Sequence, residues 1–314
     1  MNRYFLILLF LVVYSSSAYS FELDWEASTT VNAGSGGFAP SLIMANRGGT
    51  ITHSKGVYER AGIFHKLEPD KRFSYSCGLD AYVQATSTVD YMKWNSDTKE
   101  FSMFARRPSY AVIQQLYGLI KYRSLFLSVG MKEHDRTFLD NPLSSGDITL
   151  SNNARPVPQV RVGGYDYVNN PFTQGWVQII GDIAYGKFMD SNWNKDHYNY
   201  YNSFLTTDVW FHYKRLYLRS NPKQRFVATV GMQHAAQFNG EYKIYRKGVC
   251  AEVYKPEHFL RSFLDVFVQA QYNSSSIEGE SMNFSGNHLG SWDAKFEYKL
   301  KNNDIVSFYV MKPW

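Results

Sequence analysis

The sequence predicts an all-β fold, a transmembrane antiparallel β-barrel of the outer-membrane type. Three observations predict it. The chain begins with an export signal, and later segments of about ten residues alternate apolar and polar side chains, as strands between lipid and a polar interior do. Aromatic residues make up 17 % of the sequence, and no long apolar run follows the signal. A soluble, tyrosine-rich all-β domain has a similar composition, so composition alone leaves that alternative open.

Residues 1–20 have the features of a cleaved signal peptide. Arg3 supplies the positive start, residues 4–13 the apolar stretch, and Ala18-Tyr19-Ser20 the cleavage pattern. The apolar stretch is too short to cross a bilayer as a helix, which needs about 20 residues. Because no linker or shift in composition divides the rest, we expect residues 21–314 to form one barrel domain in the outer membrane.

The first part of the mature chain combines a flexible segment with clear strands. Residues 25–47 are rich in Gly, Ser and Asn and predict a first strand followed by a turn or plug segment. Residues 73–81 alternate strictly between apolar and small or polar side chains. Residues 112–122 and 125–132 predict a hairpin with a tight turn at Arg123-Ser124, and turns this short belong on the periplasmic side of a barrel.

Residues 143–164 form a polar loop that continues into a strand with two different faces. An arginine facing lipid at the bilayer midplane costs about 2–4 kcal/mol. We therefore expect Val160 and Val162 to face lipid, and Gln159 and Arg161 to face the interior.

The second half predicts further strands joined by alternately short and long connections. A turn at Asn221-Pro222 joins two of them, and residues 190–202 form a long loop dense in Asn, Asp and Tyr. In the run Gly231 to Gln237, strict alternation places His234 on the face of Met232, the wall of the barrel. The predicted strands are residues 176–188, 210–219, 226–238, 263–272, 292–300 and 305–311, which brings the total to about a dozen.

The net charge and the two cysteines limit which ligands and metals the protein could bind. The formal net charge is +5, one unit of which leaves with Arg3, and this favours anionic partners mildly. No basic run indicates nucleic acid. Cys77 and Cys250 match no metal spacing. Export permits a disulfide between them, and two unpaired thiols fit equally well.

Several runs resemble the capsule assembly family typified by Wzi, in its Bacteroidetes-like form. The similarity extends over nearly the whole mature chain. It rests on SSGDITLSNNARPVPQVRVGG at 144–164, on LYGLIKYRSLFLSVGMKE before it, and on GMQHAAQFNG and NHLGSWD after it. The resemblance implies a partly plugged outer-membrane barrel that holds capsular polysaccharide as a lectin, with no known catalytic step. Family members are longer, so we expect this chain, ending at Lys312-Pro313-Trp314, to be truncated and its barrel to be incomplete at the C-terminus.

Polysaccharide binding requires aromatic faces for sugar rings and amide or charged groups for hydroxyls and carboxylates. Alternatively, the arginines could pair with acidic residues on neighbouring strands, and the aromatics could form interfacial girdles. The candidates for glycan contact are Asn152, Asn153, Arg155, Gln159, Arg161, Trp193, Tyr198, Gln237 and His288.

Enzymatic functions have little support in the sequence. It contains no nucleophile elbow, zinc spacing or phosphate loop, and carboxylates such as Asp265 and Asp293 are more typical of charges inside a barrel. We expect no catalytic residue, no metal and no cofactor. The expected partners are capsular or exopolysaccharide and outer-membrane lipid, with the protein as a monomer. The rival function is a porin-like channel for sugars or other small solutes, and a truncated chain without function is a third possibility.

Overall fold

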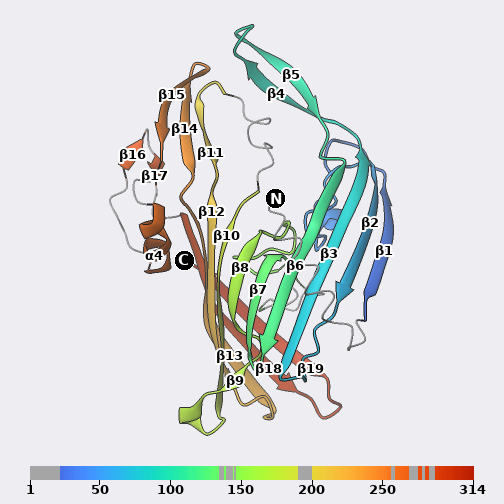
Figure 1. The fold of residues 1–314 in the computed structure, drawn as a ribbon, viewed down its shortest axis with the longest axis vertical. Helices are drawn as coiled ribbons and strands as arrows, with labels where there is room; N and C mark the ends of the chain where they lie inside the picture. The colour runs from blue at the N-terminus through green and yellow to red at the C-terminus, as the bar shows by residue number, and fades with distance from the viewer. Residues whose placement is uncertain are drawn as a thin grey trace, which may run out of the picture.

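The structure is a computed structural model that describes residues 22–133, 138, 144, 146–189, 200–255, 259–268, 275–277, 280–282 and 287–314. Its main element is a 12-stranded antiparallel sheet in the order β1-β2-β3-β6-β7-β8-β10-β12-β13-β18-β19, with β9 paired to β10 (Figure 1). The order follows the sequence, so each strand returns beside the one before it. The smaller elements are inserted between these strands.

The strands of the main sheet match most of the segments predicted from alternation. They are β1 (Asp24–Asn32), β2 (Gly56–His65), β3 (Phe73–Thr86), β6 (Ala111–Tyr122), β7 (Leu125–Met131), β8 (Gln159–Gly164), β9 (Val168–Asn169), β10 (Val177–Lys187), β12 (Trp210–Ser220), β13 (Phe226–Phe238), β18 (Asn287–Lys299) and β19 (Ile305–Pro313). The predicted hairpins at Arg123-Ser124 and Asn221-Pro222 are confirmed as the β6–β7 and β12–β13 pairs. Of the described helices, none is long and apolar enough to cross a membrane.

Short and long connections lie at opposite ends of the sheet. The turns after β2, β6, β12 and β18 lie at the lower end in Figure 1, and the inserted elements lie towards the upper end. The inserted strands are β4 (Val89–Asn95), β5 (Glu100–Arg106), β11 (Ser203–Thr207), β14 (Glu241–Arg246), β15 (Val249–Tyr254), β16 (Ser275–Ile277) and β17 (Glu280–Met282). They form separate small sheets, of which β4–β5 and β11–β14–β15 project from the upper end (Figure 1).

The two faces of the main sheet differ in polarity. In β3 the outer residues are apolar and exposed, as with Leu79, whereas the inner residues Ser76, Asp80 and Gln84 are buried. In β8, Val160 and Val162 are 50 % and 47 % exposed and Arg161 is 9 % exposed. The predicted division of this strand into an outer valine face and an inner polar face is confirmed.

The sheet curls around a space that is bordered by β1 at one end and by β18, the last strand but one, at the other. Ser28 and Thr30 of β1 line the same cavity as Asn287 and Leu289 of β18. The strands of this sheet pair antiparallel throughout, which confirms the prediction of an all-β, antiparallel fold. Within the described residues, β1 pairs only with β2 and β19 only with β18, so closure of the sheet into a ring is not seen.

Two long connections fold into the space that the sheet encloses. The β1–β2 connection, residues 33–55, contains the short helix α2 (Ser41–Met44), and the second connection is the described end of the β7–β8 loop, residues 146–158. They bond to each other: Gly48 N donates to Asn152 O at 2.9 Å, and Asn46 N donates to Asn153 Oδ1 at 2.8 Å. The predicted plug segment after the first strand is thus present, and we call the two connections the plug loops.

One predicted strand is wrong. The segment assigned to residues 263–272 begins as a helix, α4 (Phe259–Val268), and residues 269–272 lie outside the described range. Its apolar residues recur at helical spacing, which packs Phe263 against Trp210 and Phe238 on the outer side of the sheet while Val266 is fully buried. The apparent alternation of Val266 and Val268 with Asp265 concealed this longer period.

The remaining expectations for the wall concern the cysteines and His234. Cys77 and Cys250 are free thiols. His234 lies on the wall face as predicted, where its ring stacks on Trp314 with centroids 5.6 Å apart. The interior is therefore formed by the alternate residues of the same strand.

Candidate functional site

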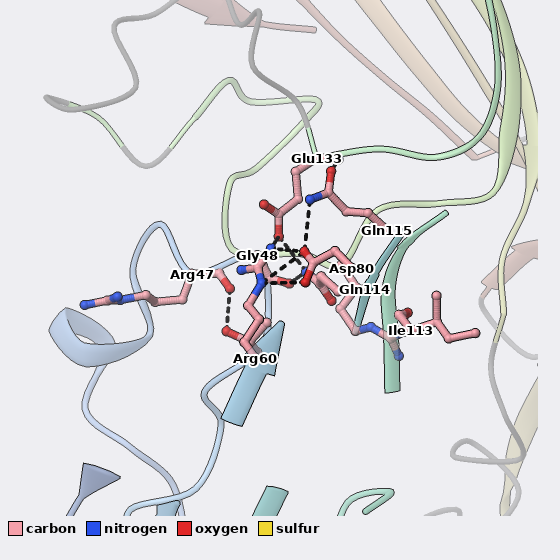
Figure 2. Close-up of polar contacts among 10 residues, drawn as sticks. Arg47, Gly48, Arg60, Asp80, Ile113, Gln114, Gln115 and Glu133 are labelled. Atoms are coloured by element: carbon pink, nitrogen blue, oxygen red, sulfur yellow. Dashed lines mark hydrogen bonds and ion pairs between the residues drawn. The ribbon is translucent and has the colours of Figure 1, made fainter. Parts of the chain in front are cut away.

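The first cluster of the polar interior holds the first plug loop to β2, β3 and β6 (Figure 2). The Arg60 guanidinium pairs with the buried Asp80 carboxylate and lies 3.0 Å from Glu133 Oε1. Gln115 Nε2 donates to Asp80 Oδ2 at 3.0 Å, and Glu133 N donates to Gln115 Oε1 at 2.9 Å. A buried carboxylate is tolerated only when its charge is matched and its oxygens are bonded, and Asp80 meets both conditions.

A β-bulge brings Gln114 into this cluster. The β3–β6 register shifts between Asp80 and Ala81, so that Gln114 and Gln115 both turn inward. Gln114 is fully buried, and its Nε2 donates to Gly48 O at 2.8 Å and to Glu133 Oε1 at 2.9 Å. Gly48 has φ +58°, and a Cβ there would lie 2.8 Å from Gln114 Nε2, so a side chain at this position would displace the Gln114 amide.

A second cluster ties β8, β10 and β12 together around Asp182. Arg161 Nε lies 2.9 Å from Asp182 Oδ1, and Arg215 Nε lies 2.6 Å from Asp182 Oδ2. All three side chains are largely removed from solvent. Arg161 therefore occupies a position in a charge network, which is the structural alternative that the sequence left open for it.

A third cluster connects the second plug loop to β12, β13 and β18. The Tyr217 hydroxyl donates to Asp293 Oδ2 at 2.6 Å, and Gln233 Nε2 donates to the same oxygen at 3.0 Å. Thr149 Oγ1, from the plug loop, donates to Gln233 Oε1 at 2.6 Å. Asp293 thus serves as a hydrogen-bond acceptor on the inner face of the sheet.

Between these clusters and the plug loops lies a cavity of about 570 Å³. Four of the predicted glycan residues line it: Asn152, Arg155, Gln159 and Gln237. A neighbouring cavity of about 680 Å³ shares Arg155 and Gln237 with the first. Two regions more than 70 residues apart in the sequence therefore contribute polar groups to one space.

The walls of the 570 Å³ cavity also contain aromatic rings that the sequence analysis did not select. Tyr58 and Tyr82 line it on one side, and Phe211 and Phe188 on the other. Strand phase could have found the two tyrosines, because Tyr58 and Tyr82 alternate in step with the inward-facing Arg60 and Asp80. Rings beside amides and a guanidinium can contact both the apolar face and the hydroxyls of a sugar.

The other predicted residues have different positions. Asn153 accepts the bond from Asn46 between the plug loops. His288 lies on the outer side of the sheet, where its Nδ1 is 2.8 Å from His234 Nε2. Trp193 and Tyr198 lie outside the described residues. In the part of the chain that is described, no group of three His, Cys, Asp or Glu is arranged to hold a metal ion.

Comparison with known families gives one match. The model of the family described as capsule assembly protein Wzi matches residues 142–311. These residues include β8, the second plug loop and Gln237, whereas LYGLIKYRSLFLSVGMKE at 116–133 lies before the match. A comparison with curated proteins found no match. Because the family model covers more than half of the 314 residues, the chain belongs to the Wzi capsule assembly protein family.

Proposed function

We propose that this protein binds capsular or exopolysaccharide at the outer membrane and organises it at the cell surface, as a monomeric, lectin-like protein without a catalytic step. Membership of a capsule assembly family supports the role in the capsule. The observation that carries the binding step is the 570 Å³ cavity, whose wall contains Arg155, Asn152 and Gln237 together with the aromatic residues Tyr58 and Phe211.

We propose that the main sheet inserts into the outer membrane with its apolar face against lipid, after export directed by residues 1–20. The exposed outer side chains support this arrangement, because an apolar surface of this extent is unfavourable in water. The end with the short turns would face the periplasm. The plug loops and the projecting strands β4, β5, β11, β14 and β15 would then lie towards the cell exterior.

The rival function is a porin-like channel. The bonds from Gly48 to Asn152 and from Gln114 to Gly48 oppose it, because they hold chain inside the space that a channel would leave open. Large, steady single-channel steps in planar bilayers would favour the channel over the lectin-like function.

The binding step is tested by Arg155→Ala. The only protein partner described for the Arg155 side chain is the backbone oxygen of Ile113, at 2.9 Å, so its removal should leave folding intact. If Arg155 contacts glycan, the lost charge-assisted bond is worth about 1.5–3 kcal/mol, or about tenfold to a hundredfold in affinity. We expect cells that carry the variant to shed polysaccharide into the medium while retaining normal amounts of folded protein, as judged by heat-modifiable gel mobility.

A matched control is Arg225→Ala, which removes an exposed arginine from the β12–β13 turn at the other end of the sheet. This control should retain polysaccharide normally. If Arg155→Ala reduces the amount of folded protein instead, Arg155 has a structural role and the proposed contact is wrong.

A further inference from the structure

We propose that the polysaccharide held in this cavity is acidic, with carboxylate or sulfate groups on its sugars that bind Arg47 and Arg155. The inference rests on the proposed function and specifies its ligand. It follows from the excess of positive charge in the cavity wall.

The wall of the 570 Å³ cavity contains more cationic than anionic groups. Its charged residues are Arg47, Arg60, Arg155 and Glu133. Glu133 lies 3.0 Å from Arg60, and the same guanidinium also pairs with Asp80. Glu133, which has the only carboxylate that the described residues place in the cavity wall, is therefore already paired with Arg60. The guanidinium groups of Arg47 and Arg155 remain.

Arg47 and Arg155 form no ion pair with any described residue. Arg155 donates one hydrogen bond, to Ile113 O, although a guanidinium has five N–H donors. Figure 2 shows the Arg47 side chain extending away from the Arg60–Asp80–Glu133 cluster. Both residues are exposed, and they belong to different plug loops.

The hydrogen bonds between the plug loops hold Arg47 and Arg155 in the wall of the same cavity. Asn46, next to Arg47, is bonded to Asn153, and Gly48 is bonded to Asn152. Gly49 lies so close to Arg155 that a Cβ on it would be 3.1 Å from Arg155 Cγ. Like charges gathered in a partly enclosed space raise the local potential and attract anions.

Guanidinium groups fit carboxylates and other oxyanions particularly well, because two parallel N–H groups can bind two oxygens. A neutral glycan would gain hydrogen bonds from the same arginines but no ion pair. The tyrosines in the same wall would remain available for the sugar rings, so one cavity could recognise both the ring and its charge.

The test uses the full-length protein in detergent and the surface polysaccharide extracted from the source cells, in three forms. One form is native. In the second the carboxylates are reduced to alcohols, and in the third sulfate esters are removed. We expect tight binding of the native form at low salt and at least about tenfold weaker binding of the form that has lost the anionic group. The second and third forms show whether that group is a carboxylate or a sulfate.

The variants Arg47→Gln and Arg155→Gln should each weaken binding of the native form about tenfold or more, whereas Arg225→Gln should not. Arg155→Lys should recover part of the affinity, because it keeps the charge but loses the two-point bond. If neither chemical treatment weakens binding, or if the Gln variants bind native polysaccharide as well as wild type, the acidic-ligand proposal is overturned and the proposed function remains. If no form binds at all, the proposed function itself fails.

Discussion

The outer and inner faces of the main sheet reverse the arrangement found in soluble proteins. On β3, the outward Leu79 is 50 % exposed, and the inward Asp80, its neighbour in the chain, is 1 % exposed. A protein surrounded by water would place the leucine inside and the aspartate outside. The polar groups available for chemistry therefore lie in the interior, where charged clusters also hold the strands together.

The largest expected effect comes from breaking an inner cluster. Asp182→Ala leaves Arg161 and Arg215 buried without their common carboxylate. Removing one partner of a buried ion pair costs about 3–5 kcal/mol. We expect a large loss of folded protein, measured by urea unfolding in lipid vesicles. Asp166→Ala, in an exposed connection, is the control, and equal stability of the two variants would mean that the inner cluster is not structural.

A smaller effect is expected when an arginine is placed on the outer or on the inner face of the same strand, β8. Val162→Arg places a charge on the outer face of β8, and Gln159→Arg places the same charge on its inner face. At the membrane midplane a lipid-facing arginine costs up to about 2–4 kcal/mol. We expect Val162→Arg to insert into vesicles less well than Gln159→Arg. Equal insertion of the two variants would contradict the assignment of the outer face to lipid.

The smallest expected effect concerns an ion pair outside the main sheet. Glu241 of β14 lies 2.7 Å from both Lys243 Nζ and Lys255 Nζ, and these bonds lower the pKa of its carboxyl from 4.5 to about 2. Because the folded pKa lies below the unfolded one, this contribution to stability is present above pH 4.5 and is lost as the pH falls through about 2.

The Glu241 side chain is 22 % exposed whereas that of Asp182 is fully buried, so solvent screens the Glu241 pairs and their contribution should be far smaller than that of Asp182. We expect Glu241→Gln to lower thermal stability slightly at pH 7, and by less as the pH falls below 4.5. A loss of stability as large as that caused by Asp182→Ala would show that burial does not determine the strength of these ion pairs.

The sequence was sufficient to predict the strands whose faces differ clearly. Alternation of apolar and polar residues identified β3, β6, β7 and β18, because only one face of each is apolar. The same pattern is weak in β2, where the charged Glu59 occupies the outer face, and this strand was not assigned. The helix α4 was assigned as a strand because its short run fits both periods.

The site could be predicted only in part. Asn152, Arg155, Gln159 and Gln237 were expected to contact glycan, and all four line the cavity. Arg47 was missed because a position in a glycine-rich segment carries no signal of its own. Its place beside the second plug loop depends on contacts between residues about a hundred positions apart, such as Asn46 with Asn153.

Polysaccharide binding in the interior can be measured as the protection of a cavity residue from chemical modification. Gln237→Cys, with Cys77 and Cys250 replaced by serine, places a thiol in the wall of both cavities, and Lys223→Cys places one in the turn at the opposite end. We predict that polysaccharide slows the reaction of a water-soluble maleimide at position 237 and leaves position 223 unchanged. Equal rates at position 237 with and without polysaccharide would contradict binding in the interior.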